Sequence, residues 1–309
     1  MSDGFNKTLT KRFRFAVILT SATFVMEIVG GIMTNSLALL SDAGHVFMDV
    51  FALGLSWFAL YISASPPTDT RTYGWHRAEV FASFINGASL LVVAGIIFYE
   101  AISRTLNPPM VKSVGMLVFA VIGLIVNIVV AISLKDHSPE DLNIRSAFLH
   151  VMGDLLASVG VIIGGVIIYF TGLLVVDPII SILIGLIILI GAVRIILESS
   201  NVLLEGVPKG VDLNKVAKAI KGSDSVRDLH SLHIWSICYN VYALSAHIEI
   251  KNKARDSQKS IIQEINNMLS HNFHITHTTL QIECEECFGE EVIKPIKHRH
   301  RHPEGIHQH

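Results

Sequence analysis

Six long apolar runs dominate the first two thirds of the chain. A helix needs about 20 mostly apolar residues to cross the hydrocarbon core of a bilayer. The first run begins at Phe13 and is longer than the apolar core of a signal peptide, so we interpret it as a retained span. The sequence therefore predicts six transmembrane helices within residues 13–207: Phe13–Met33, Leu37–Ile62, Val80–Ile102, Val114–Leu134, Ser146–Phe170 and Pro178–Leu197.

The pattern changes at Pro208, where hydropathy falls and two periodicities alternate. Helical spacing of apolar residues predicts helices around 213–220 and 261–269, and period-two alternation predicts strands over 226–237, 241–250 and 277–283. The order helix, strand, strand, helix, strand is that of a small two-layer α+β domain, which we place at 208–284. A flexible, His-rich tail is predicted at 285–309; it carries His298, His300, His302, His307 and His309.

Positive charges are distributed unequally between the two predicted sides of the membrane. The side of the N-terminus carries eight in its loops: Lys7, Lys11, Arg12, Arg14, Arg71, Arg77, Lys135 and Arg145. The opposite side carries only Arg104 and Lys112. Short cytoplasmic loops hold the excess of Lys and Arg. The bias predicts a multi-pass protein of the cell (cytoplasmic) membrane with both termini in the cytoplasm, including an N-terminal segment at 1–12.

Composition agrees with an integral membrane protein. Of the 309 residues, 51% are hydrophobic and only 16% are charged. The net charge of −2 gives no reason to expect nucleic acid as a partner. Three cysteines argue against a disulfide scaffold, and fifteen histidines are more than a membrane protein without metal chemistry requires.

The most informative polar residues lie inside the second and fifth apolar runs. Asp42, His45 and Asp49 share one predicted span, where ionisable residues are costly and indicate a functional site. The fifth run repeats the His-x-x-x-Asp spacing as His150 and Asp154. Residues at i and i+4 lie on one helix face, so two such faces together would form a His₂Asp₂ cage suited to tetrahedral Zn²⁺. The alternative is two unrelated polar pairs with local hydrogen bonds, which the repetition in two spans disfavours.

Other polar residues within the runs have weaker interpretations. Asp42 lies three residues before His45, but the equivalent position before His150 is Ala147. We therefore assign Asp42 to the ion pathway or to a supporting role. Glu27 and Asn127 could line a hydrated path, although hydrogen bonding between helices is the commoner role of such residues.

A second candidate metal site lies in the C-terminal domain. The predicted strands present His247, His277 and Glu283, together with His230 or His233, and Cys284 and Cys287 follow as a C-x-x-C. Nitrogen, oxygen and sulfur donors of this kind suit Zn²⁺. The alternative is that exposed strand faces simply carry polar residues, which is the better interpretation for any single histidine.

Several motifs in order resemble the cation diffusion facilitator family, the zinc-type metal–proton antiporters, over nearly the whole chain. The matching stretches begin with NSLALLSDAGH at 35–45 and continue with YGWHRAE at 73–79, ING at 85–87 and NIRSAFLH at 143–150. Four further matching stretches follow: DP at 177–178, LLEG at 203–206, HSLHIW at 230–235 and SAH at 245–247.

The resemblance implies a homodimer whose protomers each have six helices and a ferredoxin-like, metallochaperone-like cytoplasmic domain. It implies a transport site at His45, Asp49, His150 and Asp154. It also implies metal held by His230, His247 and Glu283, with His277 a less certain match. Arg77 and Glu205 resemble a charge pair that acts as a hinge between the membrane and cytoplasmic parts; the alternative is two solvated charges that flank the membrane helices. Thr68, Arg71 and Trp75 occupy positions where some members carry ligands of an extra metal site, so we do not expect that site here.

The expected function is efflux of divalent cations by alternating access and proton antiport. Imidazole and carboxylate bind metal only when deprotonated, so metal and protons compete for one set of side chains. Zn²⁺ is the first candidate, Cd²⁺ and Co²⁺ follow, and Mn²⁺ fits poorly because it favours oxygen ligands. Two alternatives are an intramembrane metalloenzyme, which would need an activating base beside an open metal position, and a metal sensor. We expect no enzymatic activity.

Overall fold

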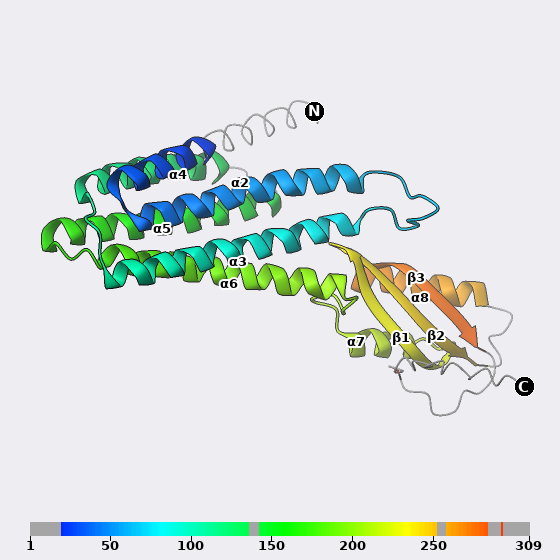
Figure 1. Cartoon of the computed structure of the whole chain (residues 1–309). Coiled ribbons are helices and arrows are strands. Elements are labelled where there is room, and N and C mark those ends of the chain that lie inside the picture. Colours follow the sequence, from blue (N-terminus) through cyan, green and yellow to red (C-terminus); the bar gives the residue numbers. More distant parts are fainter. Residues whose placement is uncertain (1–19, 136–141, 252–257, 284–291, 293–309) are drawn as a thin grey trace, which may run out of the picture. The chain divides into compact units, whose positions relative to one another are not determined.

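The computed structural model describes residues 20–135, 142–251, 258–283 and 292, and between residues 133 and 153 it describes the backbone only (Figure 1). The chain divides into two compact units. One contains the chain up to Pro66 together with Phe81–Ser199, and the other contains Pro67–Val80 and the chain from Ser200 onward.

The first unit is built from long apolar helices, in agreement with the predicted membrane domain. Five described helices are long and apolar enough to cross a bilayer, and the shorter helix Thr20–Thr34 is the described part of the first predicted span. The long helices are α2 (Leu37–Ser63), α3 (Arg77–Leu106), α4 (Ser113–Lys135), α5 (Leu142–Thr171) and α6 (Val176–Leu203) (Figure 1). Many of their large apolar side chains are exposed, for example Trp57 and Ile187, as expected of surfaces that face lipid.

Proline and close packing explain how these helices end and associate. The dipeptides Pro66-Pro67 and Pro108-Pro109 follow α2 and α3, where a residue without a backbone N–H cannot continue the helix. Helix α3 approaches α6 closely at Gly87, where a Cβ would lie 2.8 Å from Ile196 Cγ1. A small residue there lets the two backbones approach, which is how many membrane helices pack.

The second unit has the predicted order of elements. Helix α7 (Leu213–Lys221) precedes β1 (Val226–Cys238) and β2 (Val241–Ile250), and α8 (Gln258–Phe273) precedes β3 (Ile275–Glu283). The three strands form one sheet in the order β1-β2-β3. β1 and β2 pair antiparallel, whereas β2 and β3 pair parallel through the crossover helix α8. The predicted α+β fold of this domain is confirmed.

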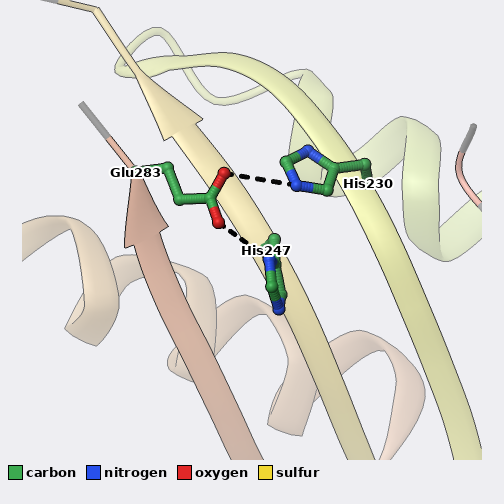
Figure 2. A group of neighbouring side chains, drawn as sticks. All are labelled: His230, His247 and Glu283. Atoms are coloured by element: carbon green, nitrogen blue, oxygen red, sulfur yellow. Dashed lines mark hydrogen bonds and ion pairs between the residues drawn. The ribbon is translucent and has the colours of Figure 1, made fainter. Parts of the chain in front are cut away.

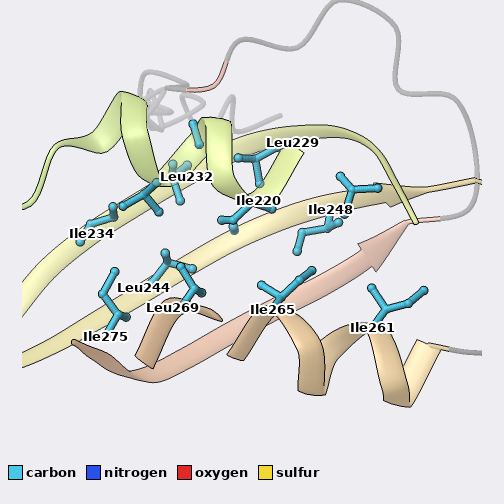
Figure 3. Close-up of a cluster of buried hydrophobic side chains, with 14 of the residues drawn as sticks. Ile220, Leu229, Leu232, Ile234, Leu244, Ile248, Ile261, Ile265, Leu269 and Ile275 are labelled. Carbon is cyan, nitrogen blue, oxygen red and sulfur yellow. The ribbon is translucent and has the colours of Figure 1, made fainter. Parts of the chain in front are cut away.

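One hydrophobic core joins both helices to the sheet (Figure 3). Ile220 of α7 and Ile265 of α8 are fully buried against strand residues such as Leu244 and Ile248. Each large apolar side chain buried in this way contributes about 1.5–3 kcal/mol to stability. Alternate residues of β2, namely Leu244, Ala246, Ile248 and Ile250, belong to this core.

A β-bulge in β1 decides which face its histidines occupy. The register between β1 and β2 shifts between His230 and His233, and Ser231 has a positive φ of 50°. Leu229 and Leu232 are both buried in the core although they are three residues apart, which uninterrupted alternation does not allow. The extra residue therefore leaves His230 and His233 both on the face opposite the core.

Candidate metal centres

Helices α2 and α5 bring three of the predicted intramembrane ligands together. His45 and Asp49 are one turn apart on α2, with 3.9 Å between His45 Nε2 and Asp49 Oδ2. Asp154 of α5 places its Oδ1 atom 3.7 Å from the same imidazole nitrogen. One donor atom from each of the three residues lies within 4.8 Å of the other two. The side chain of Asp154 is buried, and those of His45 and Asp49 are each 24% exposed.

The fourth predicted ligand, His150, lies on α5 one turn before Asp154, and its side chain lies outside the described residues. Its backbone position shares a helix face with Asp154 by the i, i+4 relation. The structure therefore brings together three of the four residues, and the role of His150 stays a prediction.

The separations of His45 from its two carboxylate neighbours are close to those in a tetrahedral metal centre. With metal–ligand bonds of 2.0–2.2 Å, neighbouring donors in a tetrahedron are about 3.3–3.6 Å apart. The observed separations of 3.7 and 3.9 Å would need to shorten by only a few tenths of an ångström. Two carboxylates and one imidazole can thus surround one divalent cation and neutralise its charge.

Two further carboxylates are buried beside this cluster. Asp42 is 3% exposed, and its Oδ1 has no hydrogen-bond partner among the described residues. It interacts electrostatically with Asp154 and Asp49 but is not in the donor group. Its supporting role stays a prediction.

Sequence reasoning undervalued Glu27. This residue is 2% exposed, and it interacts electrostatically with Asp42 and Asp154. Gly123 of α4 makes room for it, since a Cβ there would lie 3.1 Å from Glu27 Oε1. Asn127, by contrast, donates a hydrogen bond to Ser158 of α5 at 3.4 Å, which agrees with the helix–helix role expected for it. An acidic residue in an apolar run was the available signal for Glu27.

The C-terminal sheet holds the second donor group, His230, His247 and Glu283 (Figure 2). His230 Nε2 lies 3.2 Å from Glu283 Oε2, and His247 Nδ1 lies 2.8 Å from Glu283 Oε1. The two imidazole rings are 5.1 Å apart between centroids and tilted by 59°. The carboxylate faces both rings from one side, with one oxygen directed at each, so all three side chains can bind one cation.

Strand pairing explains why these three residues meet. His230 is opposite His247 in the β1–β2 ladder, and Glu249 is opposite Glu283 in the β2–β3 ladder. Asp228 is a further carboxylate close to His230, but it is engaged by Lys221 Nζ at 2.6 Å. That hydrogen bond, the largest influence, lowers the pKa of Asp228. Glu283 is thus the carboxylate available to the histidines.

The other C-terminal candidates lie outside this group. His233 is exposed and opposite Ser245, and His277 is exposed and opposite Ala243 at the other end of the domain's parallel ladder. Cys284 and Cys287 lie outside the described residues. The metal roles of these four residues stay predictions.

Glu283→Gln should weaken Zn²⁺ binding at this C-terminal group. Loss of the bridging charge should cost at least about tenfold in affinity, since even partners that only orient a ligand contribute that much. The measurement is chelator competition on the full-length protein carrying Asp154→Asn, so that the intramembrane group does not contribute. Thr279→Ala, a substitution of an exposed residue in the same strand that has no proposed metal role, is the matched control. Equal affinity in Glu283→Gln and the control would contradict the prediction.

The two residues predicted to act as a hinge are in contact, and the hinge role itself stays a prediction. Arg77 Nη2 donates to Glu205 Oε1 at 3.0 Å, and the two side chains are 43% and 64% exposed. An exposed ion pair contributes only about 0–1 kcal/mol to stability, so this ion pair adds little to the stability of the fold. Glu205 has a positive φ of 59° and follows the end of α6. Nearby in sequence, the guanidinium of Arg71 stacks over the ring of Trp75 at 3.2 Å.

Two protein families match the chain in succession. The cation efflux transmembrane domain matches residues 14–204, and the cytoplasmic domain of cation efflux proteins matches residues 208–285.

Curated relatives match along most of their length. The metal cation efflux system protein CzcD of Cupriavidus metallidurans is 41% identical over 90% of this chain and 87% of its own. The cadmium, cobalt and zinc/H(+)-K(+) antiporter of Bacillus subtilis is 37% identical over 92% of this chain and 91% of its own. The zinc transporter ZitB of Escherichia coli is 36% identical over 90% of this chain and 89% of its own. The resemblance seen in the motifs is thereby confirmed, and the chain belongs to the cation efflux family, the cation diffusion facilitators.

Proposed function

We propose that this protein exports divalent metal cations, Zn²⁺ foremost, from the cytoplasm in exchange for protons. The observation that carries the proposal is the convergence of His45, Asp49 and Asp154 from two apolar helices. Ionisable side chains at such positions are costly and mark ion pathways. The names of the relatives, a zinc transporter and a cadmium, cobalt and zinc antiporter, support the same class of cargo.

Proton exchange follows from the chemistry of the four ligands, His45, Asp49, His150 and Asp154. Each must be unprotonated to bind a metal ion, so binding releases protons and protonation releases the metal. If the site opens alternately to the two sides, protons from outside displace the cation there. The proton gradient then drives export.

The donor set determines the expected metals. Imidazole nitrogen together with carboxylate oxygen suits borderline cations, so Zn²⁺ is followed by Cd²⁺ and Co²⁺, and Mn²⁺ is disfavoured. The C-terminal group of His230, His247 and Glu283 binds the same class of cation, which makes it a sensor of cytoplasmic metal. Cys284 and Cys287 are proposed as additional thiolate donors to this group.

The proposed assembly is a homodimer in the cell membrane, with both termini in the cytoplasm. The excess of Lys and Arg on the side of the N-terminus supports this orientation. The membrane part is assigned to 13–207, the cytoplasmic domain to 208–284 and the His-rich tail to 285–309. No catalytic role is assigned to any residue.

The test of the proposed function is Zn²⁺ uptake by inverted membrane vesicles that contain the protein. Sustained uptake far above the amount of protein present, absent from vesicles without the protein, is the expected result. Uptake that stops at one or two ions per chain would indicate a metal buffer and would contradict transport.

Reversal of the Arg77–Glu205 pair should reveal whether it transmits movement between the two parts of the chain. Arg77→Glu alone should lower the Zn²⁺ transport rate several-fold, because two carboxylates then face each other, and adding Glu205→Arg should restore it. Reversal of the exposed Lys221–Asp228 pair, which joins α7 to β1, is the control. Wild-type transport rates in the Arg77→Glu and Glu205→Arg single variants would dismiss the hinge.

A further inference from the structure

The first turn of α2 is held by a carboxylate from another helix. Asp177, in the first turn of α6, is fully buried. Its Oδ2 accepts a hydrogen bond from the backbone N–H of Leu37 at 2.7 Å, and its Oδ1 accepts from that of Ala38 at 3.2 Å. Ser36 Oγ donates to Asp177 Oδ1 at 2.6 Å. The start of α2 is therefore attached to α6 by three hydrogen bonds to one charged group.

This attachment satisfies groups that a helix normally leaves unpaired. The first backbone N–H groups of a helix have no partner within it. The carboxylate of Asp177 accepts hydrogen bonds from the first two backbone N–H groups of α2. Ser36 is the N-cap residue, and its Oγ accepts a hydrogen bond from the N–H of Leu39 at 3.3 Å. Asp177 also lies in the first turn of its own helix. Its negative charge is thus favoured by the positive ends of two helix dipoles, which explains how a carboxylate is stabilised at full burial.

Other elements hold the same turn. Thr34 O accepts a hydrogen bond from the backbone N–H of Lys112 at 3.0 Å, just before α4 begins. Asn35 O accepts from Arg104 Nη1 of α3 at 2.7 Å, and Arg104 is itself held by Glu100 at 2.9 Å. The chain enters α2 from a turn that is fixed by α3, α6 and the residues that lead into α4.

The proposed metal ligands lie further along the same helix. His45 is eight residues after Leu37, about 12 Å at 1.5 Å per residue, and Asp49 is one turn beyond it. A continuous helix transmits the depth and rotation of its first turn to these positions. Movement of α2 by one residue would turn His45 by about 100° about the helix axis, away from Asp154.

We propose that Asp177 is a positioning residue for the intramembrane metal site: by fixing the start of α2 on α6, it sets the depth and rotation at which α2 presents His45 and Asp49. The inference rests on the proposed metal role of these two residues. Partners that orient metal ligands without touching the metal typically contribute 10–100-fold in affinity.

The test is Zn²⁺ affinity, measured by chelator competition on the full-length protein in a Glu283→Gln background that weakens the C-terminal group. Asp177→Asn keeps the shape of the side chain but removes its charge, and it should weaken Zn²⁺ binding at least tenfold. The matched control is Ser181→Ala. Ser181 is equally buried one turn along α6 and donates to Asp177 O rather than to the carboxylate. It should leave the affinity within threefold of the background protein.

An exchange of the two side chains separates positioning from general damage. Ser36→Asp together with Asp177→Ser returns one carboxylate and one hydroxyl to the same contact, so the affinity should recover to within threefold of the background protein. If Asp177→Asn does not fold, the Zn²⁺ affinity of the exchange variant alone tests the positioning role.

Three outcomes are decisive. An affinity in folded Asp177→Asn equal to that of Ser181→Ala would overturn the positioning role. A folded exchange variant that remains tenfold weaker would overturn it as well. Absence of Zn²⁺ binding in the Glu283→Gln background protein would instead contradict the proposed function itself.

Discussion

Asp154→Asn should abolish Zn²⁺ transport while leaving the protein folded. The substitution keeps the size of the side chain but removes one of the two negative charges that face His45. Loss of a direct ligand should cost more than the 10–100-fold typical of residues that only orient ligands, so affinity should fall by at least about 100-fold. The measurement is Zn²⁺ uptake by inverted vesicles with equal amounts of protein. Asp49→Asn should behave in the same way, because its carboxylate is an equivalent member of the group.

A matched control distinguishes the loss of a ligand from a general change in charge. Asp69→Asn removes an exposed carboxylate from the segment between α2 and α3, and transport should remain at the wild-type rate. Asp42→Asn should give an intermediate rate if that residue supports the site. Wild-type uptake in both Asp49→Asn and Asp154→Asn would exclude the intramembrane group as the transport site.

Uphill Zn²⁺ uptake should stop when the proton gradient is collapsed. Metal and protons compete for the same imidazole and carboxylate groups, so the affinity for Zn²⁺ should rise with pH. Each proton released on binding should change the apparent affinity about tenfold per pH unit over the range in which the ligands titrate. The slope of affinity against pH therefore counts the protons exchanged.

The choice of ionophore makes this experiment specific. Nigericin, which exchanges K⁺ for H⁺, should stop uptake by inverted vesicles, whereas valinomycin, which removes the membrane potential, should leave most of it. Uptake that continues at the same rate after nigericin, together with an affinity independent of pH, would contradict proton antiport.

The parts of the structure that depend on local pattern were predicted well. The apolar runs predicted the spanning helices because a bilayer imposes a minimum length on every span. The spacing of His45 and Asp49 predicted that they would meet on α2, since i and i+4 share a helix face regardless of the rest of the fold. Period-two alternation predicted the strand over 241–250 correctly, because alternation is also a local property of the chain.

Features that depend on distant contacts were not predicted. Asp177 and Ser36 are 141 residues apart, and no periodicity connects a turn before α2 with the first turn of α6. The bulge at Ser231 leaves His230 and His233 on the same face, so the choice between them required the register of the three strands. Glu27 stood out only as an acidic residue in an apolar run, because its neighbours come from other helices.

The order of β1, β2 and β3 along the chain means that the C-terminal group of candidate metal ligands is completed last during synthesis. His230 and His247 are joined by the β1–β2 hairpin, a local contact that can form early. Glu283 arrives only after the crossover through α8 and is the final residue of the last strand. A nascent chain that ends before β3 has both imidazoles but lacks the carboxylate between them. Zn²⁺ bound to all three residues, as proposed above, would stabilise the finished fold by mass action and would favour complete C-terminal domains over truncated ones.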